Sequence, residues 1–117
     1  MVTRKNASAP DLGDVVWLDH NPQAGHEQAG HRPALVLSPK AYNSASGLML
    51  CCPVTTQIKG YPFEVALTGS KGLKSVVLSD QLRSMDWEVR QATIAGRAAE
   101  AVVAEVIAKL KVLLPLQ

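Results

Sequence analysis

The stretch GHEQAGHRPALVL, residues 25–37, decides how the rest of the chain is interpreted. Its first part gathers two histidines, a carboxylate, an amide and an arginine, with glycines near both ends. From Pro33 onward it becomes an apolar run that is typical of a buried strand. Reactive polar groups on a loop anchored by a rigid strand are a common arrangement for a binding or catalytic site. We therefore expect a functional loop up to Arg32 and a strand at residues 33–38.

The size and composition of the chain predict one globular domain. The sequence has 117 residues, of which 47% are hydrophobic, and a formal net charge of +2. That charge is compatible with nucleic-acid binding but does not argue for it, because a basic patch matters more than the total. No apolar run approaches the ~20 residues that a membrane helix needs. We expect residues 1–10, which are polar and lack a signal-peptide core, to form a flexible arm, and residues 11–117 to form the domain.

The cysteines Cys51 and Cys52 are adjacent in an apolar run. Neighbouring side chains of a strand point to opposite faces, so the two thiols are not placed to form a disulfide with each other. Buried, reduced cysteines are typical of proteins in a reducing compartment. The sequence therefore predicts two free thiols and a cytoplasmic location.

Short apolar or alternating runs, separated by turns rich in Gly, Pro and Asn, predict five or six strands. They lie at residues 14–19, 33–38, 48–54, 63–68, 75–78 and 91–95. Residues 39–47 are expected to form a turn, and residues 80–87 a polar segment with one helical turn. Apolar residues at helical spacing between Val102 and Leu114 predict an amphipathic helix that Pro115 ends, with Glu105 and Lys109 as an ion pair. This pattern indicates a mainly β fold, a small antiparallel barrel capped by a C-terminal helix.

Several segments carry a family resemblance in a consistent order, namely Gly13–Asp19, Glu27–Ser38, Pro53–Gln57, Lys59–Val65 and Asp80–Ser84. Together they closely resemble the MazF/PemK toxins, the mRNA-cleaving toxins of bacterial type II toxin–antitoxin systems, and the MazF branch in particular. The resemblance implies an SH3-like barrel of the MazF/PemK/CcdB-like kind and a homodimer. It also implies metal-independent cleavage of single-stranded RNA at short motifs, and neutralisation by a cognate MazE-like antitoxin with an acidic, extended tail. His26 departs from the family pattern, and no family role is placed on it.

RNA carries its own nucleophile, the ribose 2′-hydroxyl, which can attack the neighbouring phosphorus and leave 2′,3′-cyclic phosphate and 5′-hydroxyl ends. The protein must then deprotonate that hydroxyl, stabilise the charged phosphorane and protonate the leaving oxygen. Arg32 suits the second task, because its planar, permanently charged guanidinium matches phosphate oxygens. A solvated surface ion pair is the alternative interpretation of Arg32.

Three further residues are candidates for catalysis. Thr55 resembles the family's active-site threonine, and its hydroxyl could hold a phosphate oxygen or the attacking hydroxyl. Strand alternation lets either Thr55 or Thr56 face the groove, and we choose Thr55. Glu27 and His31 are candidates for proton transfer, although His31 and Arg32 point apart if the chain is extended there.

The candidate substrate-binding residues combine phosphate contacts with base readers and stacking groups, as is usual for single-stranded RNA. They are Gln57, Lys59, Tyr61, Gln81, Arg83 and Ser84. Trp87 is a second possible stacking residue, whereas Trp17 is expected in the core. The spacing of His20, His26 and His31 fits no compact ligand pattern, so neither a metal nor another cofactor is predicted.

Two other functions compete with RNA cleavage. Gyrase-poison toxins use a related barrel and act through the end of their terminal helix, but residues 113–117 carry no aromatic group of the expected kind. A barrel that binds nucleic acid without cutting it is the third possibility, and the modest charge predicts weak, salt-sensitive binding in that case.

Overall fold

The computed structural model describes residues 9–19, 31–69 and 72–115. Within these ranges the chain forms seven strands and two helices. In chain order they are β1 (Asp14–Asp19), β2 (His31–Val36), α1 (Lys40–Ser46), β3 (Leu48–Thr55), β4 (Glu64–Thr68), β5 (Lys74–Leu78), β6 (Arg83–Asp86), β7 (Thr93–Arg97) and α2 (Glu100–Leu113). None of the helices in the described part of the chain is long and apolar enough to cross a membrane.

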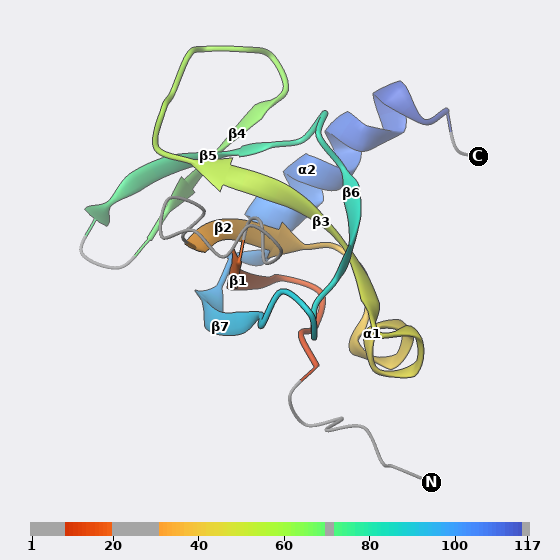
Figure 1. Cartoon of the computed structure of the whole chain (residues 1–117). Coiled ribbons are helices and arrows are strands. Elements are labelled where there is room, and N and C mark those ends of the chain that lie inside the picture. Colours follow the sequence, from red (N-terminus) through yellow and green to blue (C-terminus); the bar gives the residue numbers. More distant parts are fainter. Residues whose placement is uncertain (1–8, 20–30, 70–71, 116–117) are drawn as a thin grey trace, which may run out of the picture.

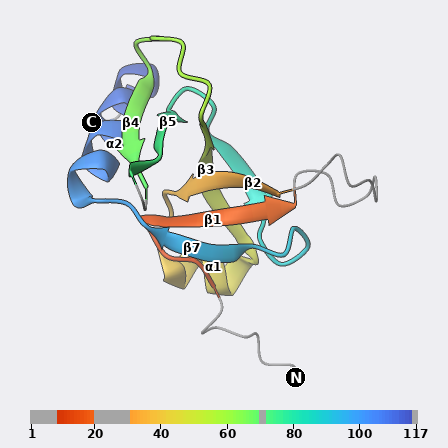
Figure 2. The same cartoon turned by 90° about the vertical axis from the view of Figure 1, so that its left-hand side faces the viewer.

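The strands form one antiparallel sheet in the order β4-β5-β3-β2-β1-β7, with β6 also paired to β3. The sheet curves into a half-barrel, and α2 lies beside β4 and β5 (Figures 1 and 2). β3 changes partner along its length, because Leu48–Cys51 pair with β6 whereas Val54 and Thr55 pair with β5. Pro53, which has no N–H to donate, falls between these two pairings. The predicted mainly β barrel with a C-terminal helix is confirmed.

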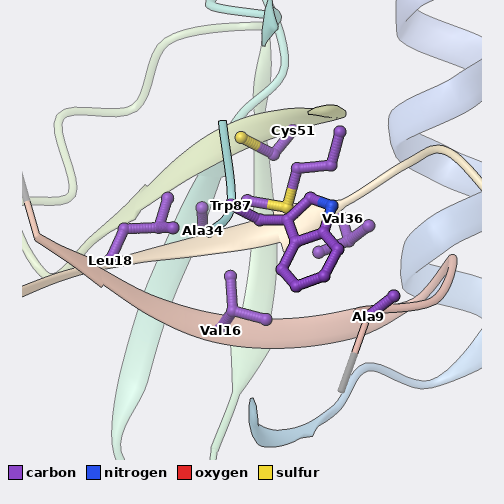
Figure 3. Packing of buried hydrophobic residues seen from close by; sticks show 8 residues of the cluster. Ala9, Val16, Leu18, Ala34, Val36, Cys51 and Trp87 are labelled. Carbon is purple, nitrogen blue, oxygen red and sulfur yellow. The ribbon is translucent and has the colours of Figure 1, made fainter. Parts of the chain in front are cut away.

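Both faces of the central strands are buried, as continuous apolar runs predict. One cluster is built on Val16, Val36 and Cys51 around the indole of Trp87 (Figure 3). The other includes Cys52 and joins β2–β5 to Val106 of α2. The two cysteines are free and belong to opposite clusters, as their adjacency in a strand predicts.

The tryptophan predictions are wrong. Trp87 is only 4% exposed and donates its indole N–H to the carbonyl oxygen of Asn43 over 2.8 Å, so it is a core residue and not a stacking platform. Trp17 is 43% exposed, because it alternates with the inward-facing Val16 and Leu18 along β1.

Helix α1 occupies a segment that was predicted to be a turn. Its fully buried Asn43 donates to the carbonyl oxygens of Pro10 and Ser38 and accepts a bond from the Ser38 hydroxyl. Ala9 and Pro10 are buried as well, although the sequence placed them in the flexible arm. The remainder of that arm, residues 1–8, lies outside the described residues.

Other element boundaries also differ from the prediction. β2 begins at His31 and not at Pro33, because the pairing with β1 extends to Asp19 opposite His31. Residues 83–86 form β6, with Met85 opposite Met49, where a helical turn was expected. β7 continues through Gly96, which pairs with Val15 beside a register shift in β1.

The C-terminal helix is confirmed as α2, which ends at Leu113 before Pro115. Glu105 and Lys109 form no ion pair within the described structure. Lys109 instead donates a hydrogen bond to the carbonyl oxygen of Pro62 in the β3–β4 connection. The helix is therefore linked to the loop that follows β3.

Candidate active site

A cleft of about 340 Å³ opens where β2 begins and β3 ends, next to the β3–β4 and β5–β6 connections. Its floor is apolar and includes Ala34, Val54 and Leu78. Its polar and charged lining comes from three separate segments of the chain and comprises Arg32, Thr55, Gln57, Lys59, Tyr61, Glu64, Asp80, Gln81 and Arg83. The fold thus gathers most of the predicted site residues in one concavity.

Arg32 and Thr55 reach this cleft from neighbouring strands. β2 and β3 pair with Ala34 opposite Pro53 and Leu35 opposite Cys52. This pairing ends at Ala34 and Pro53, and Arg32 lies two residues before Ala34 whereas Thr55 lies two residues after Pro53. Residues two apart in a strand point to the same face, so both side chains project at the same end of the paired strands and toward the face of Ala34 and Pro53. This explains why two residues far apart in the sequence line the same cleft.

The hydroxyl of Thr55 is oriented by the backbone that follows it. Its Oγ1 accepts a hydrogen bond from the N–H of Gln57 over 3.1 Å. Because this bond uses a lone pair, the hydroxyl proton stays available for an acceptor in the cleft. Thr56 is exposed and does not line the cleft. Thr55 is therefore the threonine with the geometry of a hydrogen-bond donor toward a bound anion.

The guanidinium of Arg32 is exposed, and no acidic side chain in residues 9–19, 31–69 and 72–115 forms an ion pair with it. The alternative interpretation of Arg32, as half of a surface ion pair, therefore has no acidic partner among the described residues. An exposed guanidinium at the edge of a cleft can bind an anion through two parallel N–H bonds.

His31 is not brought to the cleft. It precedes Arg32 in the same strand, so the two side chains point to opposite faces. Its Nε2 lies 3.5 Å from Oδ1 of Asp19, the residue opposite it in β1. Glu27, like His20 and His26, lies outside the described residues. No group of three potential metal ligands occurs within the described part of the chain.

Most of the predicted substrate-binding residues line the cleft, namely Gln57, Lys59, Tyr61, Gln81 and Arg83. Ser84 is exposed in β6 and does not line it. Two acidic residues of the lining, Glu64 and Asp80, were not predicted to belong to the site. The alternation of β4 places Glu64 on its outward side, and the sequence alone does not tell that this side faces a cleft.

Cys51 also lines the cleft but has the properties of a core residue. It is 1% exposed, and burial raises the pKa of its thiol to about 11, a shift that the nearby Arg83 and Arg90 only partly oppose. A thiol with this pKa stays protonated near neutral pH and is a poor nucleophile. Cys51 is therefore not a candidate nucleophile.

Comparisons with known proteins agree on one family. The family described as "PemK-like, MazF-like toxin of type II toxin-antitoxin system" matches residues 11–114. The chain is 50% identical over 105 residues to the endoribonuclease toxin MazF of Escherichia coli K12. The matched region covers 90% of this chain and 94% of that protein.

Solved structures show the same similarity. MazF in a MazE–MazF crystal structure from Deinococcus radiodurans superposes with a TM-score of 0.82 and 49% identity, covering 93% of this chain and 98% of that one. A crystal structure of MazF from the same organism gives a TM-score of 0.80 and 56% identity, covering 92% and 98%.

Proposed function

Because the chain belongs to the PemK-like, MazF-like toxins of type II toxin–antitoxin systems, we propose that this cleft cuts single-stranded mRNA in a sequence-specific reaction that needs no metal. The chain is an endoribonuclease toxin, neutralised by a cognate antitoxin of the MazE type. The observation that carries the site assignment is the convergence of Arg32 and Thr55 in one cleft.

The proposed reaction begins with attack of the ribose 2′-hydroxyl on the adjacent phosphorus. The hydroxyl gives its proton to a base as it attacks and a negatively charged phosphorane forms. The bond from phosphorus to the 5′-oxygen then breaks, the 5′-oxygen takes up a proton, and a 2′,3′-cyclic phosphate and a 5′-hydroxyl are left. The guanidinium of Arg32 binds the non-bridging oxygens, and the hydroxyl of Thr55 donates a further hydrogen bond to one of them. A guanidinium is a poor proton shuttle, so proton transfer falls to another group. Glu27 stays our candidate for the base, and the placement of His31 beside Asp19 makes His31 the weaker candidate.

We expect purified protein to cut single-stranded RNA in the presence of EDTA, because the nucleophile belongs to the substrate and the charge stabilisation comes from Arg32. The products should carry 5′-hydroxyl and 2′,3′-cyclic phosphate ends, and mapping of 5′-hydroxyl ends on a long RNA of known sequence should reveal a short shared motif. Intact RNA across many sequences would contradict the proposal. Inhibition of gyrase supercoiling without RNA cleavage would support the gyrase-poison alternative instead.

We further propose that the chain acts as a homodimer in the cytoplasm. The end of α2 leaves Val112 73%, Leu113 44% and Leu114 43% exposed, and an apolar surface of this kind favours association. Sedimentation at micromolar concentration is expected to give the mass of two chains. A monomer under these conditions would contradict the dimer.

A further inference from the structure

The β3–β4 connection, residues 56–63, forms one wall of the cleft and carries side chains suited to RNA. Tyr61 is 58% exposed, and the ammonium of Lys59 lies 5.8 Å from the centre of its ring. Both residues line the cleft. An exposed aromatic ring beside a cation can stack on a base while the cation contacts a neighbouring phosphate. This use of the wall requires that residues 59–61 keep a defined conformation.

The conformation of this wall is held by the carboxylate of Glu64. Its Oε2 accepts a hydrogen bond from the N–H of Lys59 over 3.0 Å, and its Oε1 accepts one from the N–H of Gly60 over 2.9 Å. Gly60 has a φ of +85°, a left-handed conformation that places the two consecutive N–H groups within reach of one carboxylate. Hydrogen bonds to an ionised acceptor are stronger than those between neutral groups.

Glu64 is itself fixed to the sheet. It is the first residue of β4 and pairs with Leu78 of β5. From the other side, Lys109 of α2 donates to the carbonyl oxygen of Pro62. Residues 59–62 are therefore held between a rigid strand and a rigid helix, although they have no regular secondary structure.

A carboxylate in a cleft that binds a polyanion repels the phosphates and weakens binding. We therefore expect this carboxylate to have another role that offsets the repulsion. Both oxygens of Glu64 are engaged by backbone N–H groups, which points to a structural use of the charge. We propose that Glu64 is a positioning residue that holds Lys59 and Tyr61 in the conformation that binds RNA. This inference rests on the proposed endoribonuclease function.

The Glu64→Gln variant distinguishes a positioning role from simple repulsion, because the two roles predict opposite changes in the affinity for RNA. Glutamine keeps the length of the side chain and one acceptor oxygen, but its NH₂ group cannot accept a bond from an N–H. If Glu64 acts only as a negative charge, the variant binds RNA more tightly. If it positions the loop, we expect KM to rise about tenfold, with kcat changed by less than about threefold.

The substrate for this test is a short oligoribonucleotide spanning a cleavage site that the wild-type protein shows on a long RNA. Binding is measured separately by fluorescence anisotropy on the same oligonucleotide with a 2′-deoxy group at the cut position, which removes the nucleophile. Glu100→Gln is the matched control, since it makes the same charge change at an exposed position at the start of α2 and should leave KM unchanged.

A double-mutant cycle with Tyr61→Ala tests whether Glu64 acts through the loop. If it does, adding Glu64→Gln to Tyr61→Ala should raise KM by clearly less than it does in the wild-type background. Should Glu64→Gln unfold below the assay temperature, Lys109→Met removes the second anchor and leaves the carboxylate in place. Lys109→Met is then combined with Tyr61→Ala in the same kind of cycle. We expect it to raise KM less in the Tyr61→Ala background than in the wild-type background.

An unchanged or lower KM for Glu64→Gln, or full additivity with Tyr61→Ala, overturns the positioning role while wild-type cleavage keeps the proposed function intact. A wild-type protein that cuts no RNA overturns the function and this inference together.

Discussion

Replacing Arg32 with alanine is expected to lower the rate of RNA cleavage about a thousandfold, an effect typical of removing a principal charge stabiliser from a phosphoryl-transfer site. Arg32 lies at the start of β2, lines the cleft and is exposed, so it is positioned for the substrate and contributes little to packing. The phosphorane carries more negative charge than the ground-state phosphate. The loss should therefore appear mainly in kcat and to a smaller extent in KM.

Two variants make this result specific. Arg32→Lys keeps the charge but loses the planar pair of N–H donors, so we expect an activity between those of wild type and Arg32→Ala. Lys40→Ala removes one positive charge from an exposed position on α1, outside the cleft, and should leave the rate unchanged. Thermal unfolding should give the same midpoint for all three variants within a few degrees. Full activity of a folded Arg32→Ala variant would rule out the assigned role.

Much of this fold could be predicted from the chain because most strands have a local signal. β1, β3, β4 and β5 coincide with apolar or alternating runs, and α2 with a long helical period. β6 has only four residues, two of them exposed, and is a strand because Leu48–Cys51 of β3 lie beside it. A pairing of this kind is decided by tertiary structure, which explains why a local pattern suggested a helical turn there.

Helix α1 was missed for a related reason. It has seven residues, too few for an amphipathic period, and its one buried side chain is Asn43. Asparagine is polar, so a sequence pattern predicts it at the surface. Here the side-chain amide of Asn43 is buried, and its hydrogen bonds are made with Pro10 and Ser38. The flanking residues did carry a signal, since Pro39 precedes the helix and Gly47 follows it with a φ of +77°.

The candidate site shows what sequence can and cannot predict about function. The resemblance singled out Arg32 and Thr55, but the pairing of β2 with β3 is what explains why both line one cleft. Alternation along β2 separates His31 from Arg32, and the register between β1 and β2 places His31 beside Asp19. The proposed role of Glu64 depends on hydrogen bonds to the backbone of a loop. Bonds of this kind cannot be predicted from the spacing of residue types in the sequence.

Replacing Thr55 with valine is the second test with a large expected effect. Valine has nearly the same shape but no hydroxyl, so the packing at the end of β3 is kept while one donor toward the phosphorane is lost. We expect kcat to fall about a hundredfold, as is typical for removal of one hydrogen-bond donor from a site of charge stabilisation. The N–H of Gln57 also loses its acceptor, but that atom is exposed and water can replace the bond.

Two neighbouring substitutions decide whether the hydroxyl itself is responsible. Thr55→Ser retains the donor and should stay within about fivefold of wild-type kcat, because serine can still bond to the same oxygen. Thr56→Val makes the same chemical change one residue further on, at an exposed position outside the cleft, and should leave kcat unchanged. Equal losses for Thr55→Val and Thr56→Val would indicate a general disturbance of the strand end. A large loss confined to Thr55→Val, together with rescue by serine, assigns the effect to the hydroxyl, because Thr55 lines the cleft and Thr56 does not.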